Sequence, residues 1–225
     1  MVFSSSKAGR VYNVLLERND RVVSTKEIKA ACNFLKLDFK VVMVGLTRAK
    51  VLEPAVFKGV YYVKRRDEKD LGTIKEDPLK VIARACNLKL EKNWYFGLAT
   101  ALKLSHLWGQ QTLATATVIS KKRVQRAEIS FAGMNVEFKQ LSGVSFKELV
   151  RQKGAIRYSR PARTMLDYAY FSARNRKSLE YAKTILRGIT RKTVGEKNLM
   201  EGAARLVDQY PGLYKVFLRK YFGLD

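Results

Sequence analysis

The sequence is poor in the residues from which most enzyme and metal sites are built. Its 225 residues include a single histidine, His106, and two cysteines. A structural zinc site needs four cysteine or histidine ligands, and a Ser-His-Asp triad needs a histidine in a set order with a nucleophile and an acid. No P-loop and no dinucleotide-binding fingerprint occurs in the chain. The residues therefore give no reason to expect an enzyme, a bound metal or a cofactor, and we predict none.

Long hydrophobic runs are also missing. The longest, residues 41–46 and 94–99, are too short to cross a bilayer, and the serine-rich first ten residues do not resemble a signal sequence. Cys32 and Cys86 each fall on an apolar stretch of a predicted helix without a neighbouring metal ligand, which is typical of reduced core cysteines. We therefore expect a soluble cytoplasmic protein that does not bind membranes.

Acidic residues are scarce as well. The chain has 44 Lys and Arg against 20 Asp and Glu, which gives a formal net charge of +24. Residues 1–66 contain 14 basic and 5 acidic side chains, a net charge of +9, and the remainder carries +15. A charge of this size exceeds what solubility requires and indicates a polyanionic partner. Both halves are basic, so the second half is not a neutral partner-binding module.

Residues 24–63 have the pattern of a winged helix-turn-helix. Ser24 and Glu27 form a capping box at the start of a helix that runs to about Cys32. After a break, Asp38 can cap a second helix. Four apolar positions at helical spacing give this second helix one buried face: Phe39, Val42, Met43 and Leu46.

The segments around these two helices complete the predicted domain. Residues 7–18 read as a preceding helix with one apolar stripe. Residues 51–57 and 60–63 read as two short strands joined by a turn at Lys58-Gly59. Val22-Val23 is a minimal strand that can pair with them. We place the end of this domain near residue 66.

A single helix fits the DNA major groove, and a basic hairpin can lie along the phosphate backbone. We predict that this domain contacts double-stranded DNA through polar and basic residues on the second helix, in the turn before it and along the hairpin: Lys36, Lys40, Thr47, Arg48, Lys50, Lys58, Lys64, Arg65 and Arg66. The same pattern is compatible with a solvated basic face on a domain that binds only protein. Binding to an inverted repeat would place two copies on DNA, so self-association is plausible.

The rest of the chain predicts a mixed α+β domain over residues 78–225 that ends in helices, after a linker at residues 67–77 rich in charge. The expected elements are a helix from Pro78, a buried helix at 94–107, strands at 112–120, 127–131, 135–141 and 155–158, a short helix at 145–153, and four helical segments after Pro161. The fold class is therefore α+β.

Three stretches together resemble the AbiEi family, the antitoxins of type IV toxin-antitoxin systems. They are the wing end Gly59-Val60-Tyr61-Tyr62-Val63, the aromatic-led segment from Tyr95-Phe96-Gly97-Leu98 to His106-Leu107-Trp108-Gly109, and Ser159-Arg160-Pro161-Ala162-Arg163-Thr164-Met165-Leu166-Asp167. The resemblance covers residues 7 to about 170. It implies a transcriptional autorepressor of its own operator and an antitoxin that opposes a nucleotidyltransferase-like toxin, without requiring a stable complex with that toxin.

Some charged residues remain to be explained. Arg163 and Asp167 stand four apart at the start of a predicted helix, and we expect a structural role for them, as we do for His106. A basic face in the C-terminal third is expected to contact DNA phosphates or an acidic partner: Arg174, Arg176, Lys177, Lys183, Arg187, Arg191 and Lys192. Two alternatives stay open. One is a basic regulator or architectural protein without a toxin, and the other is a metal-dependent nuclease that uses Glu128, Glu137 and Lys139.

Overall fold

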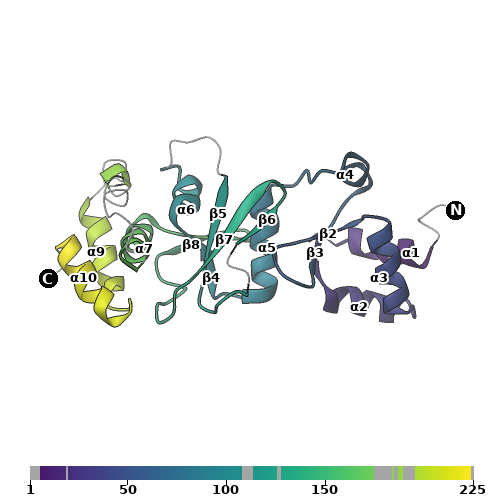
Figure 1. Ribbon diagram of the computed structural model, residues 1–225, viewed down its shortest axis with the longest axis horizontal. Coiled ribbons are helices and arrows are strands. Elements are labelled where there is room, and N and C mark those ends of the chain that lie inside the picture. Colours follow the sequence, from purple (N-terminus) through teal and green to yellow (C-terminus); the bar gives the residue numbers. More distant parts are fainter. Residues whose placement is uncertain are drawn as a thin grey trace. The chain divides into compact units, whose positions relative to one another are not determined.

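The computed structural model describes residues 6–18, 20–107, 114–125, 128–174, 184, 187–189 and 196–223. They form a mixed α+β fold, which confirms the predicted class. The chain divides into two compact units (Figure 1). One comprises Met1–Lys89 with Ser130–Ala132, and the other comprises Leu90–Ile129 with Gly133–Asp225. Among the helices described, none is long and apolar enough to span a membrane.

The N-terminal unit combines three helices with a small antiparallel sheet. The sheet has the strand order β1-β3-β2, so the predicted pairing of Val22-Val23 with the hairpin is confirmed. The bounds are α1 Lys7–Leu16, β1 Val22–Ser24, α2 Thr25–Phe34, α3 Phe39–Arg48, β2 Leu52–Pro54 and β3 Val60–Val63.

Both predicted helix caps are present. The Ser24 hydroxyl accepts from the Glu27 N–H, and the Glu27 carboxylate accepts from the Ser24 N–H at 2.8 Å, so the capping box opens α2. The Asp38 carboxylate accepts from the Val41 N–H at 2.9 Å and opens α3. Local hydrogen bonds thus place the start of each helix where the sequence predicts it.

The core of this unit fixes how α3 is oriented. Val42 and Leu46 are fully buried, while Phe39 and Met43 pack against the same cluster. A Cβ added at Gly45 would lie 2.6 Å from the Cβ of Ala8 in α1, so only glycine permits this close approach of the two helices. The opposite face of α3 therefore points away from the core.

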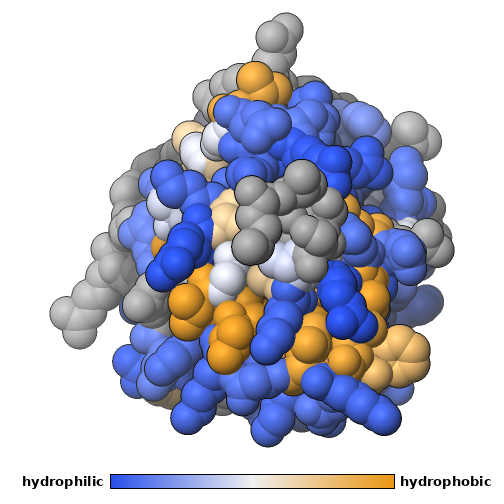
Figure 2. Space-filling view, turned by 90° about the vertical axis from the view of Figure 1, so that its right-hand side faces the viewer, coloured by the Kyte–Doolittle hydropathy of each residue, from blue (hydrophilic) through white to orange (hydrophobic). Residues whose placement is uncertain are grey.

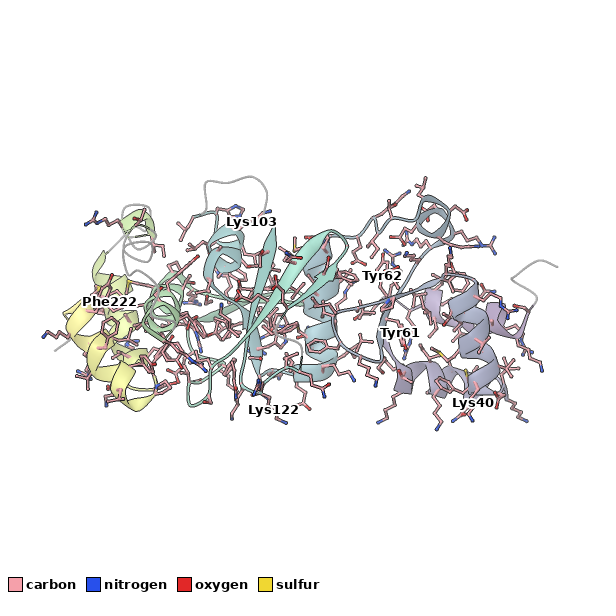
Figure 3. All side chains as sticks on the ribbon, in the orientation of Figure 1. Lys40, Tyr61, Tyr62, Lys103, Lys122 and Phe222 are labelled. Atoms are coloured by element: carbon pink, nitrogen blue, oxygen red, sulfur yellow. The ribbon has the colours of Figure 1, made fainter. Side chains whose placement is uncertain are left out.

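Residues 67–77, predicted as a linker, are built into the N-terminal unit. They contain most of α4 (Arg66–Leu71), whose Glu68 is fully buried. Four donors surround the Glu68 carboxylate: Tyr62 Oη at 2.7 Å, the N–H groups of Arg65 and Lys75 at 2.8 Å each, and Arg21 Nη1 at 2.5 Å. Tyr61 and Tyr62 leave opposite faces of β3, with Tyr62 on the side nearer α4 (Figure 3). The charged residues of this segment led to the prediction of a linker, because the sequence does not show which of them form hydrogen bonds or ion pairs with distant residues.

The division between the units falls at Lys89 and Leu90, after α5 (Pro78–Leu90), and not within 67–77. Arg84 of α5 forms ion pairs with Glu76 at 2.5 Å and with Asp20 at 3.4 Å. Arg21 also reaches Glu76, at 3.4 Å. These pairs connect α5 to the segment that follows α4 and to the residues just before β1 within one unit.

The C-terminal unit is built on a six-stranded mixed sheet with the order β6-β7-β5-β4-β9-β8, of which only the last two residues of β6 are counted with the N-terminal unit. Pairing is parallel between β5 and β7 and between β4 and β9, and antiparallel between β4 and β5 and between β8 and β9. The bounds are β4 Trp94–Phe96, β5 Thr115–Ser120, β6 Glu128–Phe131, β7 Met134–Gln140, β8 Val150–Lys153 and β9 Ile156–Ser159.

Two predicted helices of this unit are wrong. Residues 94–107 contain the buried strand β4 and only then a helix, α6 (Leu98–Leu104). A run that is apolar on all sides fits a central strand as well as a buried helix. Residues 145–153 form an irregular segment followed by β8, because pairing with β9 across a turn at Gly154 outweighs helix propensity.

From Pro161 onward the described residues are mainly helical, as predicted. The helices with complete bounds in the described part of the chain are α7 (Pro161–Arg174), α9 (Glu196–Val207) and α10 (Gly212–Phe222). Side chains from all three join one apolar cluster with β4, β5 and α6, including Tyr95, Leu166, Tyr170, Leu206 and Leu218.

Candidate nucleic-acid interface

The outward face of α3 presents five exposed residues in one stripe. They are Lys40, Val41, Val44, Thr47 and Arg48, which recur at the spacing that places side chains on one side of a helix. Lys40 extends away from the unit (Figure 3). The helix contains no acidic residue, so its exposed charge is entirely positive. This face has the width and charge that suit a polyanionic groove.

Sequence reasoning missed the two valines on that face. Val41 is 55% exposed and Val44 59% exposed, whereas the neighbouring Val42 and Leu46 are fully buried. The run from Val41 to Leu46 reads as continuously apolar. The position of each residue around the helix distinguishes the exposed from the buried members of this run, because Val41 and Val44 project opposite the stripe that contains Val42 and Leu46.

Lys36 and Lys50 follow the C-caps of α2 and α3 in the left-handed conformation, with φ of 53° and 55°. The residue after each lysine donates its N–H to a carbonyl in the last turn of the preceding helix. Leu37 donates to Cys32 of α2 at 2.9 Å, and Val51 donates to Leu46 of α3 at 3.4 Å. Glycine is the usual residue at such a position, since a side chain there costs roughly 1–2 kcal/mol. Both lysines are exposed. Local stability therefore does not explain why lysine occupies these two positions.

The predicted hairpin turn is confirmed. The Val60 N–H donates to the Phe57 carbonyl at 3.1 Å across Lys58 and Gly59, and Gly59 has a φ of 74° that only glycine adopts at low cost. The Gly59 carbonyl accepts from the Thr25 N–H at 2.8 Å, which ties the turn to the start of α2. Lys58 is exposed at this turn.

Lys64 does not belong to the exposed surface, in contrast to the prediction. It is 8% exposed, and its Nζ lies 2.6 Å from Oε2 of Glu53 on the neighbouring strand. The strand β3 ends one residue earlier, and its pairing with β2 turns Lys64 inward toward Glu53. Arg65 and Arg66 remain exposed at the start of α4.

The basic residues of the C-terminal unit are partly described. Arg174 is exposed at the end of α7, and Arg187 is exposed in a helical turn. Five others of the predicted basic face lie outside the described residues: Arg176, Lys177, Lys183, Arg191 and Lys192. Arg174 contributes to a depression of about 330 Å³, which is lined by Ser120, Arg123, Val124, Phe138, Lys139, Gln140 and Arg174. Three cationic side chains thus surround this hollow.

Two of the three residues of the nuclease hypothesis, Glu137 and Lys139, form an ion pair. Lys139 Nζ contacts Oε1 of Glu137 two residues earlier on β7, and the Lys139 ammonium lies 5.5 Å from the Phe171 ring centroid. Glu128 is exposed on β6. In the part of the chain that the structure describes, no group of three or more His, Cys, Asp or Glu could hold a metal ion. The sequence pattern at Glu137 and Lys139 therefore corresponds to a strand ion pair.

Arg163 and Asp167 are fully buried. Asp167 accepts from Tyr210 Oη at 2.6 Å and from Tyr95 Oη at 3.1 Å. The Arg163 guanidinium lies 4.3 Å from the Tyr95 ring centroid, and its Nη1 donates to the carbonyls of Ser145 and Glu148. The two residues thus link α7 to β4, to the irregular segment before β8 and to the segment that follows α9, which is a structural role as predicted.

Burial dominates the titration of this pair. It raises the pKa of Asp167 from 3.8 to about 6, although the Arg163 charge and the two tyrosine hydroxyls favour the carboxylate. Burial alone would lower the pKa of Arg163, because it disfavours the charged guanidinium. Nearby Tyr95 and Asp167 outweigh burial, and the pKa of Arg163 is raised. Arg163 therefore stays protonated, and Asp167 titrates close to neutral pH.

The two cysteines and the single histidine have structural roles. Cys32 and Cys86 are free and buried, and burial raises the pKa of each thiol, which confirms reduced core cysteines. His106 is exposed, with a φ of 58°, directly after α6. Its N–H donates to the Lys103 carbonyl at 3.0 Å, so His106 takes part in ending the helix.

No protein-family model matches the chain, and no curated protein matches it significantly. A solved structure that is similar is the crystal structure of the RV2827C protein from Mycobacterium tuberculosis, with a TM-score of 0.58 and 12% identity. The match covers 94% of this chain and 80% of that chain. At this identity the likeness concerns the fold alone.

Proposed function

We propose that this protein is a transcriptional autorepressor that binds double-stranded DNA through its N-terminal unit. The proposal is supported by the element order α1-β1-α2-α3-β2-β3 and the three-stranded sheet, which match what is expected of a winged helix-turn-helix. We assign α3 as the recognition helix and the β2–β3 hairpin as the wing. The observation that carries the proposal is the outward face of α3, which is exposed, basic and free of acidic residues.

Within this proposal the exposed residues have different tasks. Lys40, Thr47 and Arg48 face the base edges, where an arginine can pair with a guanine through two hydrogen bonds. A second group contacts phosphates and positions the protein without reading sequence: Lys36, Lys50, Lys58, Arg65 and Arg66. Lys64 is left out because it is buried against Glu53.

For the biological role we propose an antitoxin of a type IV toxin-antitoxin system, which opposes a nucleotidyltransferase-like toxin encoded with it. The support is the AbiEi resemblance. Two of the stretches that carry it contribute to one buried cluster, since Tyr95 donates to Asp167. In this role the C-terminal unit supplies the antitoxin function and additional phosphate contacts from Arg174 and its basic neighbours.

A second candidate is a basic regulator or architectural protein without a toxin. It is favoured by one observation, the wide distribution of positive charge over both units. Such a protein would bind duplexes of different sequence with similar affinity, because phosphate contacts carry no sequence information.

One titration separates these candidates. The protein is titrated against the duplex directly upstream of its own gene and against a scrambled duplex, at two salt concentrations with Mg²⁺ present. Tighter binding to the intact upstream duplex supports the autorepressor. Equal binding to both supports the architectural protein, and cleaved DNA would revive the nuclease hypothesis at Glu128 and Glu137.

Two substitutions test the assignment of roles. Arg48→Ala should weaken binding to the upstream duplex by about 1–3 kcal/mol and relax specificity, because a base contact is lost. Lys58→Ala should weaken both duplexes alike and lower the salt slope by about 1. Equal losses on both duplexes for Arg48→Ala would contradict its role in base recognition.

A further inference from the structure

The exposed face of α3 contains two valines that contribute nothing to the core. Val41 and Val44 are both more than half exposed, and they stand one helical turn apart. The close contact of Gly45 with Ala8 sets the rotation of α3, so these side chains stay outside the unit. Their side chains are therefore available to a partner that binds this face.

Their grouping distinguishes them from ordinary surface valines. Seven large hydrophobic side chains are exposed among the described residues, and three of them, Phe34, Val41 and Val44, belong to α2 and α3. Figure 2 views the molecule from the side where α1 to α3 lie, and it shows hydrophobic side chains between hydrophilic ones on that face. Single exposed apolar residues are common, whereas Val41 and Val44 stand together on one exposed helical face and form a small apolar patch within a basic stripe.

The charges beside the valines indicate what binds there. Lys40 adjoins Val41 along the helix, and Arg48 lies one turn after Val44. Protein interfaces are depleted of charge at their centre, so this mixture suits them poorly. The major groove of DNA offers partners for both kinds of side chain. Phosphates along its edges can bind the lysine and arginine, and the C5-methyl groups of thymine on its floor can contact the valines.

We propose that Val41 and Val44 contact thymine C5-methyl groups in the major groove and so give the protein a preference for thymine at two positions of its binding site. This inference rests on the proposed function and names the bases that the same helix reads. The two residues are separated by about 4.5 Å along the helix axis, and base pairs by about 3.4 Å. The two thymines should therefore lie in neighbouring or next-neighbouring base pairs.

The test compares thymine with uracil, which differs only in lacking the methyl group. Sites preferred by the full chain are first selected from a pool of random duplexes. They are then synthesised with thymine or with uracil, and both forms are titrated at one salt concentration. Each contacted methyl is worth about 0.8 kcal/mol, so wild type should bind the uracil form about fourfold more weakly per methyl, and about 15-fold for two.

The matched variant is the double substitution Val41→Ala, Val44→Ala. Both side chains are exposed and alanine favours helix, so folding should be unaffected. This variant should lose affinity for the thymine form and show almost no further loss with uracil. Lys58→Ala serves as the control, because it should weaken both forms equally and keep the full uracil penalty.

The outcomes separate this inference from the proposed function. Clear sequence preference with equal affinity for thymine and uracil overturns the valine contacts and leaves the DNA-binding function intact. Failure to select any preferred sequence overturns both the valine contacts and the proposed sequence-specific repressor. A uracil penalty that survives in the valine variant, or dissociation of a protein dimer by that variant without DNA, would assign the valines to another role and overturn the inference.

Discussion

Asp167 gives this protein a pH-dependent stability with a definite sign. Its pKa is raised from 3.8 to about 6 because the carboxyl group is fully buried. A raised pKa means that the folded state holds the proton more tightly than the unfolded state. The contribution to stability is therefore fully present below pH 4 and is lost as the pH rises through 6.

The magnitude follows from the shift. Each pKa unit corresponds to about 1.4 kcal/mol, so ionisation of Asp167 should lower the free energy of unfolding of the C-terminal unit by about 3 kcal/mol over the whole titration, of which about 2.5 kcal/mol is lost between pH 4 and pH 7. Asp167→Asn is neutral at every pH and can still hydrogen-bond to the hydroxyls of Tyr95 and Tyr210. The variant should match wild type near pH 4 and exceed its stability by about 2.5 kcal/mol at pH 7.

Urea unfolding followed by tryptophan fluorescence measures this difference. Both tryptophans, Trp94 and Trp108, fall in the sequence of the C-terminal unit, so their emission reports that unit alone. Asp208→Asn is the matched control. Hydrogen bonds from Lys215 and Arg219 lower the pKa of the exposed Asp208, so its contribution has the opposite sign and is lost as the pH falls.

Parallel stability curves for wild type and Asp167→Asn from pH 4 to pH 7 would refute the reasoning. They would mean that Arg163 and the two tyrosine hydroxyls fully offset the cost of burial. A variant that becomes less stable relative to wild type as the pH rises would mean that the pKa of Asp167 is lowered in the folded state.

Three further predictions concern single contacts. Glu68→Gln should destabilise the N-terminal unit by about 1–3 kcal/mol, since the amide cannot satisfy all four donors. The pKa of Glu68 is lowered in the folded state, so wild type gains stability above pH 4.5 and the variant should not. Far-UV circular dichroism measures the unfolding of wild type and variant as a function of pH. Lys50→Gly should stabilise the same unit by about 1 kcal/mol in thermal melts, yet lower the salt slope of DNA binding by about 1; unchanged DNA binding would remove Lys50 from the interface. Gly97→Ala should cost about 1–3 kcal/mol in urea, because the new Cβ would lie 2.3 Å from Ile119 Cδ1, and adding Ile119→Val should recover part of that loss if this clash is the cause.

Elements that depend on local interactions could be predicted from the amino-acid sequence. Ser24 with Glu27 and Asp38 identify the starts of α2 and α3, because the capping hydrogen bonds join residues three apart. Lys58-Gly59 identifies the hairpin turn for the same reason. The excess of basic residues, which points to a polyanionic partner, also requires only the composition.

Tertiary structure decided the features that depend on partners distant in sequence. Trp94 to Phe96 became a strand because β5 and β9 pair with it, and residues 67–77 became part of the N-terminal unit because Glu68 meets Arg21, 47 residues away. Lys64 is turned away from the exposed surface by its ion pair with Glu53 across the sheet. The orientation of Val41 and Val44 was set by the packing of α3 on α1, since an apolar run does not specify which of its residues will find a core to enter.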